Sequence, residues 1–331
     1  MRLLLILLPY LISAQTLPTN IKKYYIDVNQ AEMSIVNNNI NEAINYYETA
    51  FKQIENPFCR DRYNLAVCYA KNKNKTKTFL ELQKIVSLGY PLDSIKNNKF
   101  FKKYAKKLKR EQIKFDKNYR DIIDSLLYID QKFRKIDSKL YKDTIKAIDI
   151  KNVETLKKLF KDKGFPSESR IGVYAAFNWS ALDIIFKHNY YHNEYPYRFN
   201  FSSYLEQAIK TADIDARIAI THIAGLNGND PFGSLFNAII QHGYAIDEER
   251  KVYSELSKEA LINLEGKDTK KINESRADFG LCSIEDYQKK IRFQRKNKEF
   301  KILVATESYK KFYWKTKEEY EKSIKNVIFL E

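Results

Sequence analysis

The chain has 331 residues, of which 44% are hydrophobic, and it carries a formal net charge of +16. The hydrophobic content can build a sizeable core and excludes wholesale disorder, while 9 Gly and 7 Pro are too few for the many turns of a sheet protein. We therefore expect an all-α fold, and the basic residues are too dispersed among acids to indicate nucleic acid as a partner.

The first residues have the layout of a cleaved export signal. Arg2 precedes an apolar run from Leu3 to Ile12, and Ser13-Ala14-Gln15 offers a small residue before the cut. Ten or so apolar residues are about half of what spans a bilayer, and no later stretch is long and apolar enough. We expect residues 1–14 to be a signal peptide and the mature chain to be periplasmic or secreted, without a transmembrane segment.

Residues 24–88 divide into four expected helices separated by short polar breaks. A shift of 35 positions aligns Ala31 with Ala66 and Tyr47 with Leu82. Small residues at close crossings and large ones in the gaps suit packed antiparallel helices. The segment is similar to tetratricopeptide repeats, whose helix pairs recur about every 34 residues.

The repeat resemblance leaves two uses of these helices open. Such repeats usually bind a peptide or a helix on their concave face, and the alternative is that they only pack against the next domain. Thr78 departs from the pattern, since the second repeat should carry Ala there. Two repeats cannot bury a core alone, so we expect a capping helix within a first domain over 15–110.

The cysteines are expected to be free thiols. Cys59 and Cys68 are nine residues apart on or near one predicted helix, roughly 13 Å along its axis. A disulfide needs Cα atoms within about 7 Å. Cys282 has no partner at a recognisable spacing, and no C-x-x-C motif occurs.

Residues 111–290 are expected to form a second helical domain. Over roughly 125–290 the chain resembles an uncharacterised family of exported bacterial domains of unknown function, and it departs from that family at 230–235, where Asp-Pro-Phe-Gly-Ser-Leu replaces Gln-x-Tyr-Gly-Thr-Gln. The family has no established chemistry, so the resemblance implies a related fold and a set of residues. These are Asp130-Gln131-Lys132-Phe133-Arg134, Asn152, Gly164-Phe165-Pro166, His188, Gly280-Leu281 and Tyr287.

His188 is the first candidate for chemistry. It follows an apolar run near the end of a predicted helix, where the helix dipole favours a protonated imidazole, and its alternative role is a structural cap. Asp130 and Arg134 are four residues apart, so they either orient an anionic ligand or a catalytic histidine, or simply form an ion pair. Gln131 and Asn152 complete the set as candidate ligand-binding residues.

Metal and cofactor motifs are weak or missing. His188 and His192 have the four-residue spacing of two ligands on one helix face, but no H-E-x-x-H arrangement surrounds them. His222 and His242 are single histidines on predicted apolar helices and are expected to be structural. The sequence contains no Gly-rich phosphate loop, no Gly-x-Ser-x-Gly elbow and no Cys–His motif, so we predict no cofactor.

Residues 291–331 form a charged, aromatic-rich tail that we expect to dock on the body, with Phe300 to Thr306 reading as either a strand or a buried helix turn. Two functions are compatible with these features. The first is a non-catalytic interaction or scaffold protein of the cell envelope with a protein or peptide partner. The second is a hydrolase or small-ligand-binding protein built around His188, Asp130 and Arg134, which requires these side chains to converge.

Overall fold

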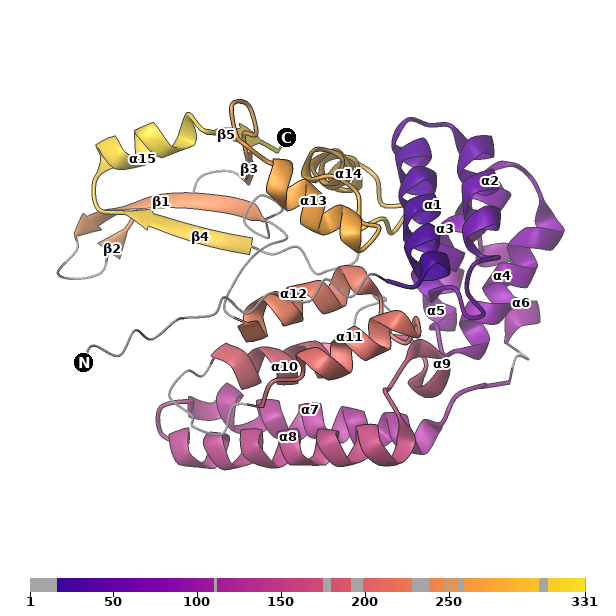
Figure 1. The fold of residues 1–331 in the computed structure, drawn as a ribbon, viewed down its shortest axis with the longest axis horizontal. Helices are drawn as coiled ribbons and strands as arrows, with labels where there is room; N and C mark the ends of the chain where they lie inside the picture. Colours follow the sequence, from indigo (N-terminus) through magenta and orange to yellow (C-terminus); the bar gives the residue numbers. More distant parts are fainter. Residues whose placement is uncertain are drawn as a thin grey trace, which may run out of the picture.

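The computed structural model describes residues 17–109, 112–174, 180–191, 199–227, 238–247, 249, 252–254, 259–303 and 309–330. The described chain is mostly helical, with fifteen α-helices and a small five-stranded sheet (Figure 1). The expectation of an all-α fold is therefore wrong in one respect. A single small sheet needs few turns, so the scarcity of Gly and Pro did not reveal it.

The first four helices form two antiparallel pairs joined by tight polar turns. Asn38 adopts a left-handed backbone conformation, φ 63°, between the first two, and Lys73 does the same, φ 57°, between the last two. Thr78 is fully buried, and its hydroxyl donates to the Asn74 carbonyl at 2.7 Å, so it replaces the expected Ala without leaving an unsatisfied polar group. The helices are α1 (Thr19–Val36), α2 (Ile40–Ala50), α3 (Cys59–Lys71) and α4 (Lys75–Ser87).

A set of short helical turns covers the end of these pairs. Phe101 is fully buried and meets the Tyr63 ring edge to face, with ring centres 5.4 Å apart. Leu108 is also fully buried. The turns are α5 (Leu92–Lys96), a 3₁₀ turn at Lys102–Tyr104 and α6 (Ala105–Leu108).

Two long antiparallel helices form the base of the middle region (Figure 1). The second of them ends at Gly164, whose φ of 75° suits a helix C-terminus. Above this hairpin, α10 packs between α7 and α8 on one side and α12 on the other. The helices of this region are α7 (Lys117–Asp137), α8 (Lys142–Lys163), α9 (Glu168–Ile171), α10 (Ser180–Tyr191), α11 (Ser202–Lys210) and α12 (Ala216–Asn227).

The sheet is built around one central strand, β1. It pairs in parallel with β4, from Ile239 opposite Tyr309 to Tyr244 opposite Trp314, and antiparallel with β2 and β3, while β3 also pairs antiparallel with β5. The C-terminal aromatic run is thus a strand, although we expected strand character only at 300–306. Residues 300–303 have no regular structure, and 304–306 lie outside the described residues. The remaining elements are β1 (Ile239–Asp247), β2 (Val252–Tyr253), β3 (Ala260–Ile262), α13 (Lys270–Asp278), α14 (Ile284–Lys296), β4 (Tyr309–Trp314), α15 (Lys317–Ile324) and β5 (Val327–Phe329).

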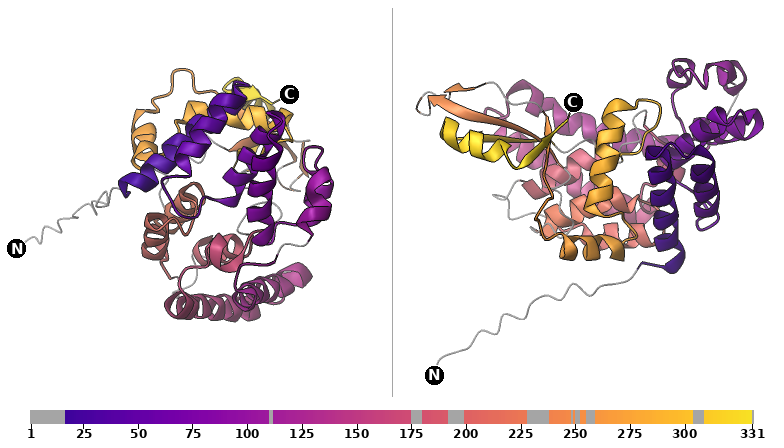
Figure 2. Two further views of the ribbon diagram at one scale, coloured as in Figure 1. Left: turned by 90° about the vertical axis from the view of Figure 1, so that its right-hand side faces the viewer. Right: turned by 90° about the horizontal axis from the view of Figure 1, so that it is seen from above.

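One apolar core runs through most of the described helices. It extends from Leu17 to Ile302 and includes side chains of both predicted domains and of the tail. In Figure 2, α14 lies beside α1, which joins the C-terminal part to the first helix. None of the described helices has the length and apolar character needed to cross a membrane.

Residues 300–302, after α14, lie against α3. The Asn64 side chain accepts from the Lys301 backbone N–H at 2.8 Å and donates to the Lys301 carbonyl at 3.0 Å. Phe300 and Ile302 are both 2% exposed. These residues therefore cover part of α3 from within the same chain.

Candidate functional site

Three neighbouring helices bring a histidine and two carboxylates together. Asp130 lies on α7, Asp149 on α8 and His188 on α10. One ligand atom from each lies within 4.8 Å of the others. Asp130 and Asp149 occupy the buried faces of amphipathic helices, whereas the His188 side chain keeps 23% of its surface exposed. The arrangement has a buried acidic floor and a more accessible imidazole.

His188 and Asp130 form a direct pair. The Nδ1 atom of His188 lies 3.0 Å from Oδ1 and 2.9 Å from Oδ2 of Asp130, whose side chain is 1% exposed. Burial alone would raise the pKa of Asp130, but hydrogen bonding and charge at His188 outweigh it, so this pKa lies below its usual value. Gln131 adds a 2.7 Å hydrogen bond from Nε2 to Oδ2. The carboxylate is thus held ionised beneath the imidazole.

Arg134 links the two carboxylates instead of pairing only within its own helix. Its Nη2 donates to both oxygens of Asp149 at 2.7 Å, and its Nη1 donates to the Asp130 carbonyl at 2.9 Å and lies 3.4 Å from Oδ1. Burial raises the pKa of Asp149, and Arg134 offsets only part of this. Two carboxylates and one guanidinium leave one negative charge, which a protonated His188 would balance.

Asn152 lies one helical turn after Asp149 on α8 and is 2% exposed. Its Nδ2 has no hydrogen-bond partner among the described residues. A buried amide donor of this kind costs free energy unless a partner arrives. Of the candidate residues, Asp130, Gln131, Arg134 and His188 come together, and Asn152 lies on the next turn of an adjoining helix.

The donor set can be compared with a metal site. Two carboxylates and an imidazole are suitable ligands for a divalent transition metal. However, Arg134 Nη2 already donates to both oxygens of Asp149, so a cation would have to displace this ion pair. The other metal candidate, His192, lies outside the described residues. The geometry therefore fits a hydrogen-bonded acid–base cluster better than a metal centre.

The other two histidines are buried, 1% exposed for His222 and 5% for His242, and make polar contacts. His222 Nε2 lies 3.2 Å from Asp183 Oδ1, which ties α12 to α10. His242 lies on β1, not on a helix as we expected, and its Nδ1 is 2.8 Å from Ser323 Oγ. The cysteines at 59, 68 and 282 are free, as expected.

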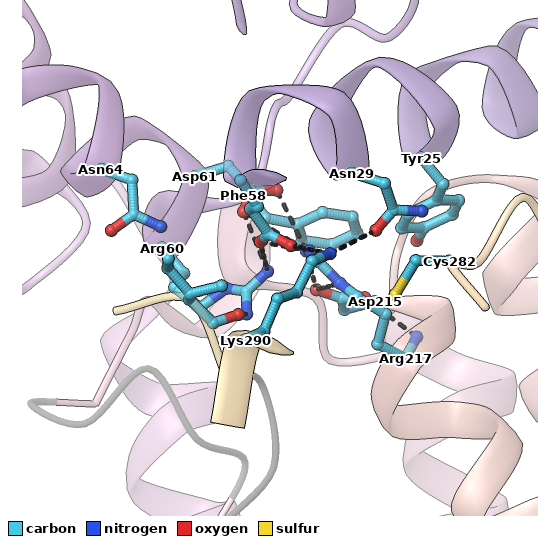
Figure 3. Close-up of polar contacts among 12 residues, drawn as sticks. Tyr25, Asn29, Phe58, Arg60, Asp61, Asn64, Asp215, Arg217, Cys282 and Lys290 are labelled. Carbon is cyan, nitrogen blue, oxygen red and sulfur yellow. Dashed lines mark hydrogen bonds and ion pairs between the residues drawn. The ribbon is translucent and has the colours of Figure 1, made fainter. Parts of the chain in front are cut away.

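A second polar cluster joins the N-terminal helices to α12 and α14 (Figure 3). Lys290 donates to Glu32 at 2.7 Å and to Asn29 at 3.0 Å, and Arg217 lies 3.0 Å from both Glu32 and Asp61. Three cations and three carboxylates make the cluster neutral, and none is more than 9% exposed. Its charged members are Glu32, Arg60, Asp61, Asp215, Arg217 and Lys290.

This buried cluster is a structural junction. Burying charges is tolerable only when they are paired and hydrogen-bonded, and here the charges are supplied by segments far apart in the sequence. Tyr25 extends the junction, since its hydroxyl oxygen accepts from the Ala216 backbone N–H at 2.8 Å at the start of α12.

Sequence reasoning missed Asp149 and the whole junction. The available signal was a charged residue inside an apolar helical stripe. Asp149 stands between the buried Ile145 and Val153, and Lys290 precedes the buried Ile291. A pocket of about 450 Å³ lies at the opposite end of α7 from the His188 cluster and is lined by Ile113, Lys114, Phe115, Asp116, Tyr119, Lys163, Ser169 and Arg170.

No family model, curated protein or solved structure matches this chain.

Proposed function

We propose that the protein binds a small polar ligand at the Asp130–His188 pair and acts on it hydrolytically, with His188 as the general base. The observation that carries the proposal is the contact of a buried carboxylate with Nδ1 of a partly exposed imidazole. If Nδ1 carries the proton in that contact, Nε2 has the electron pair that accepts a proton from water.

The surrounding residues support assigned roles in such a step. When His188 takes a proton from the attacking water, the ionised Asp130 stabilises the resulting imidazolium, as the carboxylate does in histidine–aspartate pairs of known hydrolases. Arg134 and Gln131 hold Asp130 in position. The unpaired buried amide of Asn152 is available to a ligand acceptor. His188 is the catalytic residue in this proposal, and the other four are positioning or binding residues.

The competing scaffold function has less support from the first helix pairs. Their α3 face is occupied by residues 299–302 of the chain itself, through Asn64, Arg60 and the buried Phe300. That contact favours packing on the adjoining region over capture of a separate peptide. The repeat and family resemblances remain predictions.

Export is part of the proposal and has its own test. The layout of residues 1–14 supports cleavage after Ala14. When the full chain is expressed in a bacterium, mass spectrometry of the protein recovered outside the cytoplasm should give Gln15 as the first residue. An intact Met1 in that fraction would contradict it.

The catalytic part is tested with chromogenic esters, phosphates and glycosides and a labelled peptide, using wild type and His188→Gln. We expect one substrate class to be turned over and the substitution to lower kcat about 100-fold or more. Asp130→Asn should also lower kcat, because the amide no longer stabilises the imidazolium. His222→Gln is the matched control, since it removes the other His–Asp contact on α10 and should leave kcat unchanged.

A His188→Gln enzyme with wild-type kcat on the accepted substrate would refute the role of His188. Absence of turnover of every class, together with no ligand-induced shift in melting temperature that depends on His188, would refute the hydrolytic proposal as a whole. Circular dichroism of each variant verifies that it is folded.

A further inference from the structure

Large apolar side chains are exposed at the end of α7 and in the turn that follows it. Tyr128 is 69% exposed, Ile129 42%, Ile136 63% and Leu140 73%. Four of the eleven exposed large apolar side chains of the described chain thus fall within thirteen residues. Single exposed apolar residues are ordinary, but a contiguous group usually marks a contact surface.

Helical spacing puts this group on one side of the hairpin. Ile129 and Ile136 are seven residues apart on α7, so they share one face of the helix, and Leu140 lies in the turn that directly follows it. The Asp137 carboxylate accepts from the backbone N–H groups of Lys139 and Leu140 at 2.9 and 3.1 Å, which shapes the turn after α7. Figure 1 places this α7–α8 turn at an edge of the molecule, opposite the first four helices.

Lysines accompany the apolar side chains. Lys132, Lys135 and Lys139 are all exposed and alternate with Ile136 and Leu140 along the same end of the hairpin. Their charge complements an anionic surface. It also opposes a symmetric contact with a second copy, because two such faces brought together would bring six lysines close to one another.

We propose that this hairpin tip, residues 128–140, docks the protein onto an anionic lipid surface. Ile136 and Leu140 would enter the boundary between headgroups and acyl chains. The aliphatic stems of the lysines can lie along that boundary while their ammonium groups reach the lipid phosphates. The same stretch carries Asp130, Gln131 and Arg134 of the His188 cluster, but the side chains proposed to meet lipid are the exposed ones, and the proposal does not depend on the chemistry at His188.

Sedimentation with vesicles tests the proposal. The chain from Gln15 onward is used, since it keeps every described residue and removes the apolar leading segment, which would bind lipid by itself. It is mixed with vesicles of phosphatidylcholine and phosphatidylglycerol, or of phosphatidylcholine alone. We expect binding to the first and at least tenfold weaker binding to the second, with loss of binding at high salt.

Two sets of substitutions locate the contact. Lys132→Glu, Lys135→Glu and Lys139→Glu together should weaken binding about 100-fold or more, since each lysine near an anionic surface contributes roughly fivefold. Ile136→Ser with Leu140→Ser should also weaken it at least tenfold. The matched control is Lys102→Glu, Lys106→Glu and Lys109→Glu, which changes three exposed lysines of the densest basic cluster by the same net charge.

The control triple should keep most of the wild-type binding. Equal loss in both triples would overturn the proposal, because attraction would then follow net charge and not the tip. So would absence of binding to anionic vesicles. Analytical ultracentrifugation tests whether a second copy of the chain occupies the surface instead of lipid. A wild-type dimer that becomes a monomer on Ile136→Ser and Leu140→Ser would overturn the lipid proposal.

Discussion

Asp130 and Asp149 lie on adjacent helices with Arg134 between them, yet their pKa values shift in opposite directions. Burial by itself would raise the pKa of both carboxyls. Asp130 receives hydrogen bonds from His188 and Gln131 in addition to the charge of Arg134, and its pKa falls. At Asp149, Arg134 and the charge of His188 offset only part of the effect of burial, the charge of Asp130 adds to it, and the pKa stays raised. The hydrogen bonds from His188 and Gln131 therefore make Asp130 the more firmly ionised of the two.

Glu168 gives a pH-dependent prediction. Burial raises its pKa to about 7, while its Oε2 accepts from the Cys59 backbone N–H at 2.7 Å. Because the folded pKa exceeds the unfolded value, the folded state keeps its proton longer, and stability is lost as pH rises from about 4.5 to 7. Glu168→Gln should therefore gain stability relative to wild type between pH 5 and pH 8, on the order of 1 kcal/mol after allowance for solvent screening. Urea denaturation at pH 5 and pH 8 measures the free energy of unfolding of both proteins. The same difference between variant and wild type at the two pH values would contradict the prediction.

Two glycines allow a matched test of tertiary contact. Gly280 and Gly266 have nearly the same left-handed backbone, φ 68° and 69°. A Cβ on Gly280 would lie 2.7 Å from the Lys22 carbonyl oxygen on α1, whereas one on Gly266 would meet nothing within 4 Å. Gly266→Ala should cost about 1 kcal/mol from conformation alone. Gly280→Ala should cost a further 1–3 kcal/mol from overpacking, measured by thermal unfolding, and equal costs would argue against the close approach to α1.

At the scale of elements, the buried junction decides how the C-terminal helices meet the N-terminal ones. Asn29 lies one turn before Glu32 on α1. Its Nδ2 donates to the Gly280 carbonyl at 2.7 Å, and its Oδ1 accepts a hydrogen bond from Lys290. Arg60 on α3 donates to the Ile302 carbonyl. These contacts fix α14 and the segment at 300–302 against α1 and α3.

Lys290→Met tests the junction. Removing the ammonium takes away the partner of Glu32 Oε2 and leaves the buried cluster with one net negative charge, so the free energy of unfolding should fall by about 3–5 kcal/mol. Lys96→Met is the control, since it removes the exposed Lys96–Asp93 pair, whose side chains are 60% and 82% exposed. That change should stay within about 0.5 kcal/mol. Comparable losses for the two variants in chemical denaturation would rule out a special role for the junction.

At the scale of the whole molecule, the continuous core makes the first helices dependent on the rest. Residues 17–109 expressed alone would expose the faces that α12, α14 and residues 299–302 cover, including the Arg60–Asp61 charges. We expect this fragment to lack a cooperative thermal transition by circular dichroism, while the full chain unfolds cooperatively. A sharp transition in the fragment would mean that the four helices form an independent domain.

The sequence by itself determined the helical character, the four N-terminal helices with their polar turns, the end of α8 at Gly164, and four members of the His188 cluster. These depend on local periodicity, on capping residues and on residues a few positions apart, which a sequence displays directly. Tyr309 to Trp314, in contrast, became a strand because it pairs with β1, about seventy positions earlier.

Only the tertiary structure decided the partners of the buried charges. Arg134 reads as an i, i+4 partner of Asp130, but its strongest contact is with Asp149 on the next helix. Lys290 reads as a surface lysine, but Glu32, 258 positions away, pairs with it in the interior. A charge enters a core only when the fold supplies its counterion, and the counterion can come from any distance along the chain, so sequence spacing does not reveal it.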